Sequence, residues 1–322
     1  MEILSRGLTT EFVNALSAAY NDSSWWKSIV DDRELFVTPR KRCVCVYYRG
    51  NRLLKLELDG ERRLVGEIHY KYLLNPDLKP AYRNVMDGKV ASLDGIGAFV
   101  SDFSNIKLLK RASKPYAGDE KYGVSKIIEG HPNIIDVEVA FSDLGNSAED
   151  DDAPPEETVD SIDSESRHIP RIDFVAVQDD GKRLELVFFE AKYFTNHELK
   201  SGGDPRVCKQ IAKYEKLLKK NEKDVGEAYK LHCADILNSN CVPQGSKRGQ
   251  FLKMVSTKEV IVNTEPHLVV FGFDDDQRIG PAWKKHKDKL VDHFRKDSFG
   301  KDRVIFRGNP TSPVGGITFQ ER

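Results

Sequence analysis

The chain has 322 residues with a formal net charge of −1, 39% hydrophobic residues and 31% charged residues. This length can hold two domains or one large domain, and either can bury a core without disulfide bonds. The near-zero net charge argues against a protein that only coats nucleic acid through phosphate attraction. Five cysteines without dense spacing, an N-terminus without a signal-like apolar segment, and no apolar run near the membrane-spanning length of about 20 residues predict a cytoplasmic protein without membrane insertion.

The N-terminal third is predicted to be a small α+β domain. Apolar residues recur at intervals of three and four over residues 9–20, as on one face of a helix. Four β-rich runs separated by turn-forming clusters predict an antiparallel meander at residues 34–39, 42–48, 52–58 and 63–74. Residues 75–115 show no sustained period, so we place the boundary near their end. The N-terminal domain then covers residues 1–112, for target or partner recognition, and a second domain covers residues 113–322.

A dense acidic segment interrupts the second domain. Residues 142–166 contain no lysine or arginine and almost no apolar side chains, so we expect a disordered or mobile insertion at about residues 143–167. One hypothesis is that this insertion competes with DNA for a basic groove as a tethered polyanion. Deleting residues 146–164 would then change the DNA affinity and its salt dependence. The alternative is an inert insertion.

The elements around this segment are predicted in the order αβββαβ, with one helix appended. Asp204 is expected to cap a helix that has Pro205 in its first turn. A basic loop segment is expected between this helix and the last strand. The elements are a helix at residues 119–129, strands at 135–141, 171–177 and 183–194, a helix at 206–222, a buried strand at 267–276 and an amphipathic helix from Pro281.

The second and third of these strands form a hairpin that brings charged side chains together. Asp180-Gly181 favours a tight turn, and an even loop centred on it places Asp173 opposite Phe188. Glu190 then lies one diagonal step from Asp173. Because strand side chains alternate, Lys192 points to the same face as both carboxylates.

Two carboxylates that are buried together are unfavourable unless a cation neutralises them. Asp173, Glu190 and the carbonyl of Ala191 would form an oxygen site suited to Mg²⁺ or Mn²⁺. Such an ion polarises a phosphoryl oxygen and lowers the pKa of an attacking water, which Lys192 would hold or activate. The alternative is a surface Glu-x-Lys salt bridge, worth about 0–1 kcal/mol. The apolar run before Glu190 favours the buried site.

These residues resemble the motif of the PD-(D/E)xK nuclease superfamily, which places an acidic residue on one strand and (D/E)-x-K on the next. Asp173 matches the first position, and Glu190-Ala191-Lys192 matches the triplet. The proline that usually precedes the first aspartate is absent, although Pro170 lies close by. The resemblance covers residues 114–307.

A second motif on the following helix is similar to the QxxxY signature of the RecB-like branch of this superfamily. Gln210 and Tyr214 are four residues apart, which puts both on one helix face. By resemblance, they would orient the catalytic site and contact DNA, and the neighbouring Lys209 and Lys213 would contact its phosphates. The alternative is an ordinary amphipathic helix with a half-buried tyrosine.

The family also tends to place an acidic residue on its first core helix. Glu129 is our candidate for that residue and for a further metal ligand, with Glu120 and Glu138 as rivals. The resemblance thus implies an α/β, restriction-endonuclease-like core whose mixed sheet is flanked by helices.

The cysteines predict no metal cluster. Some RecB-like proteins bind an iron–sulfur cluster through four cysteines, but Cys208, Cys233 and Cys241 lack that number and spacing. Cys43 and Cys45 lie on an apolar strand without the usual spacing of zinc ligands. We expect buried thiols instead.

The resemblance implies Mg²⁺-dependent or Mn²⁺-dependent hydrolysis of phosphodiester bonds, with DNA as the expected substrate, in restriction, anti-phage defence or repair. Basic clusters at residues 209–230, 247–248 and 284–296 would supply phosphate contacts. No GxxxxGK[ST] loop is present, so a separate ATPase, helicase or other protein partner would supply any motor. Two alternatives stay open, a non-catalytic nucleic-acid or protein-interaction module and an RNA nuclease. The oligomeric state, including a homo-oligomer, also stays open.

Overall fold

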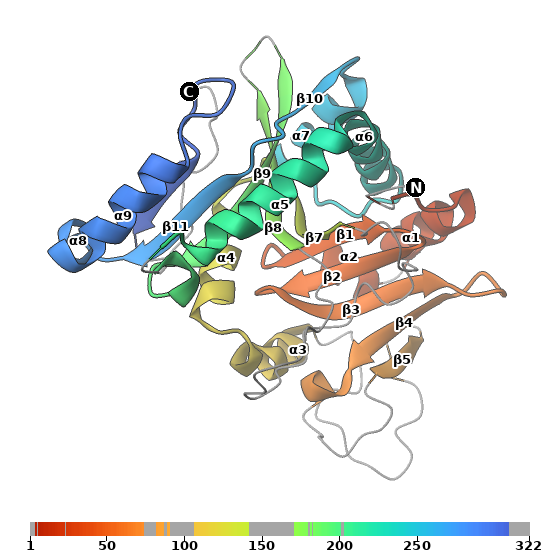
Figure 1. Cartoon of the computed structure of the whole chain (residues 1–322). Coiled ribbons are helices and arrows are strands. Elements are labelled where there is room, and N and C mark those ends of the chain that lie inside the picture. The colour runs from red at the N-terminus through yellow and green to blue at the C-terminus, as the bar shows by residue number, and fades with distance from the viewer. Residues whose placement is uncertain are drawn as a thin grey trace.

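The computed structural model describes residues 4, 6–22, 24–73, 82–86, 89–90, 106–141, 171–179, 181, 183–200 and 203–308. The acidic segment predicted at residues 143–167 lies outside the described residues. Within them the chain is a mixed α/β protein with an antiparallel sheet A and a mixed sheet B, and helices pack around both (Figure 1).

Sheet A is an antiparallel meander, as predicted. The fourth predicted strand, residues 63–74, is too long, because the strand ends at His69 and the one-turn helix η1 (Tyr70–Leu73) follows it. Its strands, as far as the chain is described, are in spatial order β1 (Leu35–Arg40), β2 (Cys43–Tyr48), β3 (Asn51–Leu58), β4 (Leu64–His69), β5 (Tyr82–Met86) and β6 (Lys89–Val90). One face of the sheet packs on α1 (Thr10–Asp22), α2 (Ser24–Val30) and α3 (Ile106–Ser113). The predicted N-terminal helix is therefore also confirmed, as α1.

Strand β2 is buried on both of its faces, because sheet A lies between the N-terminal helices and sheet B. Its odd-numbered residues Cys43, Cys45 and Tyr47 pack in a cluster shared with sheet B, and Val44 and Val46 pack toward the helices. All five cysteines of the chain are buried and free, as expected.

Sheet B has the spatial order β12-β11-β9-β8-β7, and β10 pairs with β9 outside this path. Strand β8 runs antiparallel to its neighbours β7 and β9, and β11 runs parallel to β9 and β12. The bounds are β7 (Ile134–Ala140), β8 (Arg171–Asp179), β9 (Leu184–Tyr193), β10 (Val260–Val262), β11 (His267–Phe273) and β12 (Val304–Gly308).

Helices cover one face of sheet B, while α4 (Asp119–Gly130) and sheet A cover the other. The helices of the first face are α5 (Arg206–Lys220), α6 (Glu222–Asn238), α7 (Ser246–Ser256) and α9 (Pro281–His293), with the short α8 (Asp275–Ile279) before the last. Figure 1 shows α5 lying across this face. Helices α4, α5 and α9 confirm the helices predicted in this half of the chain.

The register of the β8–β9 hairpin differs by two residues from the prediction. Val175, and not Asp173, lies opposite Phe188. Four residues separate the strands, with Gly181 at a φ of 77°, so the turn is longer and its centre lies one residue further along the chain. A register shift of two residues leaves each side chain on its predicted face. The pair that follows Phe174 and Phe189 is Asp173 and Glu190, so these two residues lie beside each other.

The prediction of a basic loop after α5 is wrong, because this segment forms the helices α6 and α7. In α6 the buried residues Val225, Tyr229, Cys233 and Ile236 recur every three or four positions. The lysine and glutamate residues between them make this periodicity difficult to recognise in the sequence. Helix α5 also begins at Arg206 with the preceding proline as its N-cap residue, so the expected aspartate cap is not formed.

The buried Asp136 of β7 ties sheet B to the N-terminal third of the chain. Its carboxylate accepts hydrogen bonds from Arg6 at 2.6 Å, from Thr38 and Arg40 at 2.8 Å, and from the Tyr229 hydroxyl at 3.2 Å. Burial alone would raise its pKa, but the two guanidinium groups hold the pKa of Asp136 well below its usual range. Arg40 also donates to the carbonyl of the next residue along β7 at 2.5 Å.

Candidate functional site

The open end of the β8–β9 ladder brings Asp173, Glu190 and Lys192 together. The ammonium of Lys192 lies 3.0 Å from Oε1 of Glu190. The backbone N–H of Ala191 donates to Oδ2 of Asp173 at 2.6 Å. Asp173 is half-buried, whereas Glu190 is 2% exposed and Lys192 is 9% exposed. The apolar strand β9 therefore carries two charged side chains into the interior.

Helix α5 holds this group in place through Gln210 and Tyr214. The Gln210 amide donates to Oε1 of Glu190 at 2.8 Å and to the Tyr214 hydroxyl at 2.9 Å. The Tyr214 hydroxyl donates to the backbone carbonyl of Arg171 on β8. Tyr214 is fully buried rather than half-buried. The two residues of the predicted QxxxY motif thus connect α5 with both site strands.

One carboxylate oxygen of this group is left without a partner. Oε2 of Glu190 is buried and accepts no hydrogen bond from any described residue. Burial raises the pKa of Glu190 to about 7 against the opposing effect of Lys192, and the charges of Glu198 and Glu120 add to the rise. Burial and the neighbouring Glu190 raise the pKa of Asp173 well above its usual range.

The unpartnered oxygen of Glu190, the carboxylate of Asp173 and the carbonyl of Ala191 fit a hard divalent cation. Among the described residues, no group of three or more His, Cys, Asp or Glu side chains could hold a metal ion. An ion at this pair would complete its coordination with the carbonyl and with water, as Mg²⁺ commonly does.

Lys192 is a hydrogen-bond donor in this arrangement. Its ammonium pairs with Glu198 at 2.8 Å as well as with Glu190. Burial opposes the charge, but Glu190 and Asp173 outweigh burial and raise the pKa of Lys192. Lys192 therefore stays protonated. The sequence did not point to Glu198, because it lies in the one-turn helix η4 (His197–Leu199), which has no periodic pattern.

Glu129, the favoured acidic residue of the first core helix, does not contact Asp173 or Glu190. Both of its carboxylate oxygens pair with Lys126, at 2.9 and 2.7 Å. It lines the same cavity as Asp173, but its ion pair is with Lys126 of the same helix.

Glu120 is the acidic residue of α4 that lies against β9. It accepts hydrogen bonds from the backbone N–H of Tyr193 at 2.9 Å and from the Asn196 amide at 2.7 Å. Gly123 allows α4 to lie close to sheet B, because a Cβ added at this position would lie 2.0 Å from the ring of Phe271. A helix with a larger residue there would stand further from the sheet.

Glu138, the other rival, lies opposite Asp173 on β7. Its two chain neighbours pair with Phe174 and Ile172 of β8, so Glu138 falls at the level of Asp173 between them. Its φ is 51°, which is uncommon for a residue with a side chain. Burial raises the pKa of Glu138, and its charge adds to the raised pKa of Asp173. Three acidic residues thus lie at one level across three strands.

Lys209 and Lys213 are exposed on α5, on the side away from its buried residues. Neither contacts the carboxylates. They are free to meet a polyanion that approaches α5 from solvent.

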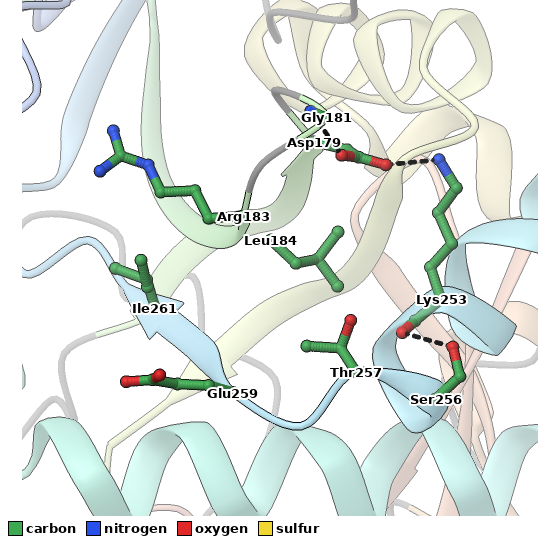
Figure 2. A pocket seen from close by; sticks show the side chains of 9 residues that line it. All are labelled: Asp179, Gly181, Arg183, Leu184, Lys253, Ser256, Thr257, Glu259 and Ile261. Atoms are coloured by element: carbon green, nitrogen blue, oxygen red, sulfur yellow. Dashed lines mark hydrogen bonds and ion pairs between the residues drawn. The ribbon is translucent and has the colours of Figure 1, made fainter.

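Two pockets lie near the β8–β9 hairpin. One cavity, of about 710 Å³, is lined by Asp173, Glu138, residues of sheet A and the first turn of α7. The other, of about 440 Å³, lies at the opposite end of the hairpin (Figure 2). There Asp179 pairs with the exposed Lys253 at 2.6 Å. Only the first pocket includes a carboxylate of the site.

The chain matches no protein-family model, no curated protein and no solved structure. Among the helices of the described residues, none combines the length and the apolar character needed to cross a membrane.

The charge of Glu190 should destabilise the metal-free protein at alkaline pH. Its folded-state pKa of about 7 lies above the usual 4.5, so the folded state binds the proton more tightly and stability falls as pH rises between these values. We expect Glu190→Gln to raise the free energy of unfolding at pH 8 in EDTA by on the order of 1–3 kcal/mol. Urea denaturation of both proteins would measure this difference in the free energy of unfolding.

Two conditions test the origin of that gain. At pH 4 both proteins carry a neutral side chain at position 190, so the difference should vanish. Saturating Mg²⁺ should reduce this difference at pH 8, because an ion bound at the pair would stabilise only the carboxylate form of Glu190. A variant less stable than the wild type at pH 8 in EDTA would contradict this account.

Proposed function

We propose that this protein is a Mg²⁺-dependent or Mn²⁺-dependent nuclease of the cytoplasm, with DNA as its preferred substrate. The single observation that carries the proposal is the buried, unpartnered Oε2 of Glu190 next to the carboxylate of Asp173. Such a pair is costly unless a cation neutralises it. Lys192 beside it supplies a positive charge for phosphate oxygens.

The order of elements supports a PD-(D/E)xK core. Helix α4, strands β7, β8 and β9, helix α5 and strand β11 follow the expected αβββαβ order, with α6, α7 and β10 inserted before the last strand. The contacts of Gln210 with Glu190 and with Tyr214 agree with the second motif. Fold order alone does not establish an activity, and the proposed activity is inferred from the contacts of Asp173, Glu190 and Lys192.

A divalent cation at Asp173 and Glu190 would polarise the phosphoryl group and lower the pKa of the attacking water. Gln210 holds Oε1 of Glu190 and so leaves Oε2 free. Lys192, which stays protonated, donates to the water or to a nonbridging oxygen and offsets the negative charge that grows during attack. Lys192 therefore positions the water and stabilises the negative charge that develops on the phosphate, and it does not remove the proton from the water.

Purified protein incubated with plasmid DNA, linear DNA and RNA tests the proposal. We expect cleavage of DNA in Mg²⁺ or Mn²⁺ and none in EDTA, because the two carboxylates alone repel phosphate. Loss of linear but not circular DNA would identify an exonuclease.

Two results would count against this proposal. Faster cleavage of RNA than of DNA would make the protein an RNA nuclease. Absence of cleavage by folded protein under all metal conditions would favour a binding module, or an enzyme that a separate ATPase, helicase or other protein partner activates.

Restriction, anti-phage defence and repair are the settings in which the proposed nuclease would act.

A further inference from the structure

The turn between β2 and β3 of sheet A reaches the cavity of about 710 Å³ that Asp173 also lines. Arg49 and Gly50 form this turn, and both line the cavity. A Cβ added at Gly50 would lie 3.3 Å from Oε1 of Glu138, the β7 residue at the level of Asp173. We propose that Arg49 binds a backbone phosphate of the DNA strand that is held at Asp173 and Glu190. Arg49 would thus be a substrate-binding residue contributed by the N-terminal sheet, an assignment that rests on the proposed nuclease function.

The geometry of this turn does not require an arginine. Tyr48 pairs with Asn51, so Arg49 and Gly50 are the two central residues of the turn. Their φ values are 50° and 69°. A two-residue hairpin turn with positive φ at both positions prefers Asn or Asp at the first position and Gly at the second. Asparagine would therefore suit the backbone at position 49 better than arginine does, and the role of Arg49 lies in its side chain.

Two aromatic rings hold the half-buried side chain of Arg49 in place. Its guanidinium carbon lies 4.4 Å from the centre of the Tyr122 ring on α4 and 5.2 Å from the centre of the Tyr48 ring. Burial raises the pKa of Tyr48, and the charge of Arg49 and a hydrogen bond from it oppose this rise. An aromatic ring attracts the positive charge but offers no lone pair to the N–H groups. Most of the guanidinium N–H groups therefore keep the capacity to bind an anion.

The acidic side chains of the cavity do not neutralise Arg49, because other cations lie next to them. Four of them form ion pairs, namely Asp31 with Lys27, Asp32 and Glu34 with Lys110, and Glu129 with Lys126. Burial raises the pKa of Glu138, and three other cations oppose this rise, namely Arg171, Lys121 and Arg40. Asp173 lies within the influence of Lys192. Arg49 forms no ion pair with any residue that the structure describes, so its charge can be used by a substrate.

A phosphodiester group matches the chemistry of Arg49. Two parallel N–H groups of a guanidinium can donate to two phosphate oxygens, and contact with aromatic rings orients the guanidinium before the substrate arrives. The cavity volume of about 710 Å³ falls within the range of small-ligand pockets, roughly 300–1,000 Å³. Part of a DNA strand can therefore lie between the carboxylates and Arg49. Because Arg49 is positively charged without any metal, it should contribute to DNA binding even when the carboxylates hold no cation.

Arg49→Asn tests this role through DNA binding in EDTA, which also prevents metal-dependent cleavage. Fluorescence anisotropy with a labelled DNA duplex should show binding weakened by about tenfold, because charged hydrogen bonds are lost. The slope of log K against log salt should become shallower by about 0.9, the value for one phosphate contact. Thermal melts should show a folded protein, since asparagine suits the turn. Arg49→Lys keeps the charge but not the paired N–H groups, so its affinity should lie between those of Arg49→Asn and the wild type.

Arg62→Asn is the matched control. Arg62 lies in the turn between β3 and β4, also has a positive φ of 62°, is exposed, and does not line the cavity. Because sheet A is a meander, this turn lies at the opposite end of the sheet from Arg49. The control removes the same charge from the same kind of backbone position. It should bind DNA as tightly as the wild type does, with the same dependence on salt.

Three results would overturn the role of Arg49. They are the absence of DNA binding by the wild type, unchanged binding by Arg49→Asn, and an equal loss of binding in Arg62→Asn, which would reflect net charge rather than position. Cleavage assays separate this role from the nuclease function. If Asp173→Asn abolishes cleavage while Arg49→Asn binds and cleaves DNA normally, only the role of Arg49 is rejected. If DNA binding depends on Arg49 but no metal supports cleavage, the phosphate contact is supported and the nuclease function is rejected.

Discussion

Replacing Asp173 by asparagine should reduce metal-dependent DNA cleavage by on the order of 10³-fold, because one of the two carboxylates that would hold the cation is lost. Asparagine keeps an oxygen that can accept the backbone N–H of Ala191. It also removes charge repulsion with Glu190, so the variant should fold at least as stably as the wild type in EDTA. Single-turnover cleavage rates and thermal melts measure the two effects.

Lys192→Met should cause a loss of similar size without weakening the metal site. Methionine keeps the unbranched stem but removes the positive charge next to Glu190. Asp179→Asn is the control for both variants, because Asp179 lies on the same strand as Asp173, in an ion pair with an exposed lysine. It should cleave normally. Cleavage within tenfold of wild type by Asp173→Asn would exclude the site as proposed.

Asp136→Ala should lower the free energy of unfolding by about 3–5 kcal/mol, because two buried guanidinium groups lose their counter-charge. Arg6 and Arg40 both pair with this carboxylate, whose side chain is fully buried. Urea denaturation followed by tryptophan fluorescence would measure the change, and the fully buried Trp26 is a suitable probe.

The exposed pair between Lys27 and Asp31 provides the control. Asp31→Ala removes an ion pair at 2.7 Å whose partners are 51% and 41% exposed, so it should change stability by only about 0–1 kcal/mol. A loss of less than 1 kcal/mol in Asp136→Ala would mean that the arginines find other partners, and the role given to Asp136 in joining the two sheets would be wrong.

The sequence allowed the site strands to be predicted because their information is local. Alternation along β9 places Glu190 and Lys192 on one face whatever the partner strand does. The register could not be read in the same way, since Asp180-Gly181 fits both a two-residue and a four-residue turn. The predicted register was wrong by two residues, and because this number is even, the face predicted for Asp173 was correct.

Other parts of the fold and of the site depend on contacts between distant residues. Asp136 has the same local context as any polar residue in an apolar strand, and its partners Arg6 and Arg40 lie 130 and 96 positions away. Glu198 reaches Lys192 from a single turn of helix. No periodic pattern marks such residues, and only the folded chain shows which charges meet.

The hydrophobic cluster between the two sheets limits how the two halves of this protein can change over evolution. Phe36, Cys45 and Tyr47 of sheet A pack in one cluster with Val137 and Phe174 of sheet B. A substitution on one side therefore alters the surface that the other side must match. The N-terminal sheet cannot be exchanged for another domain unless the replacement reproduces this surface. Substitutions are tolerated more readily at the edges and loops of sheet A than in this cluster.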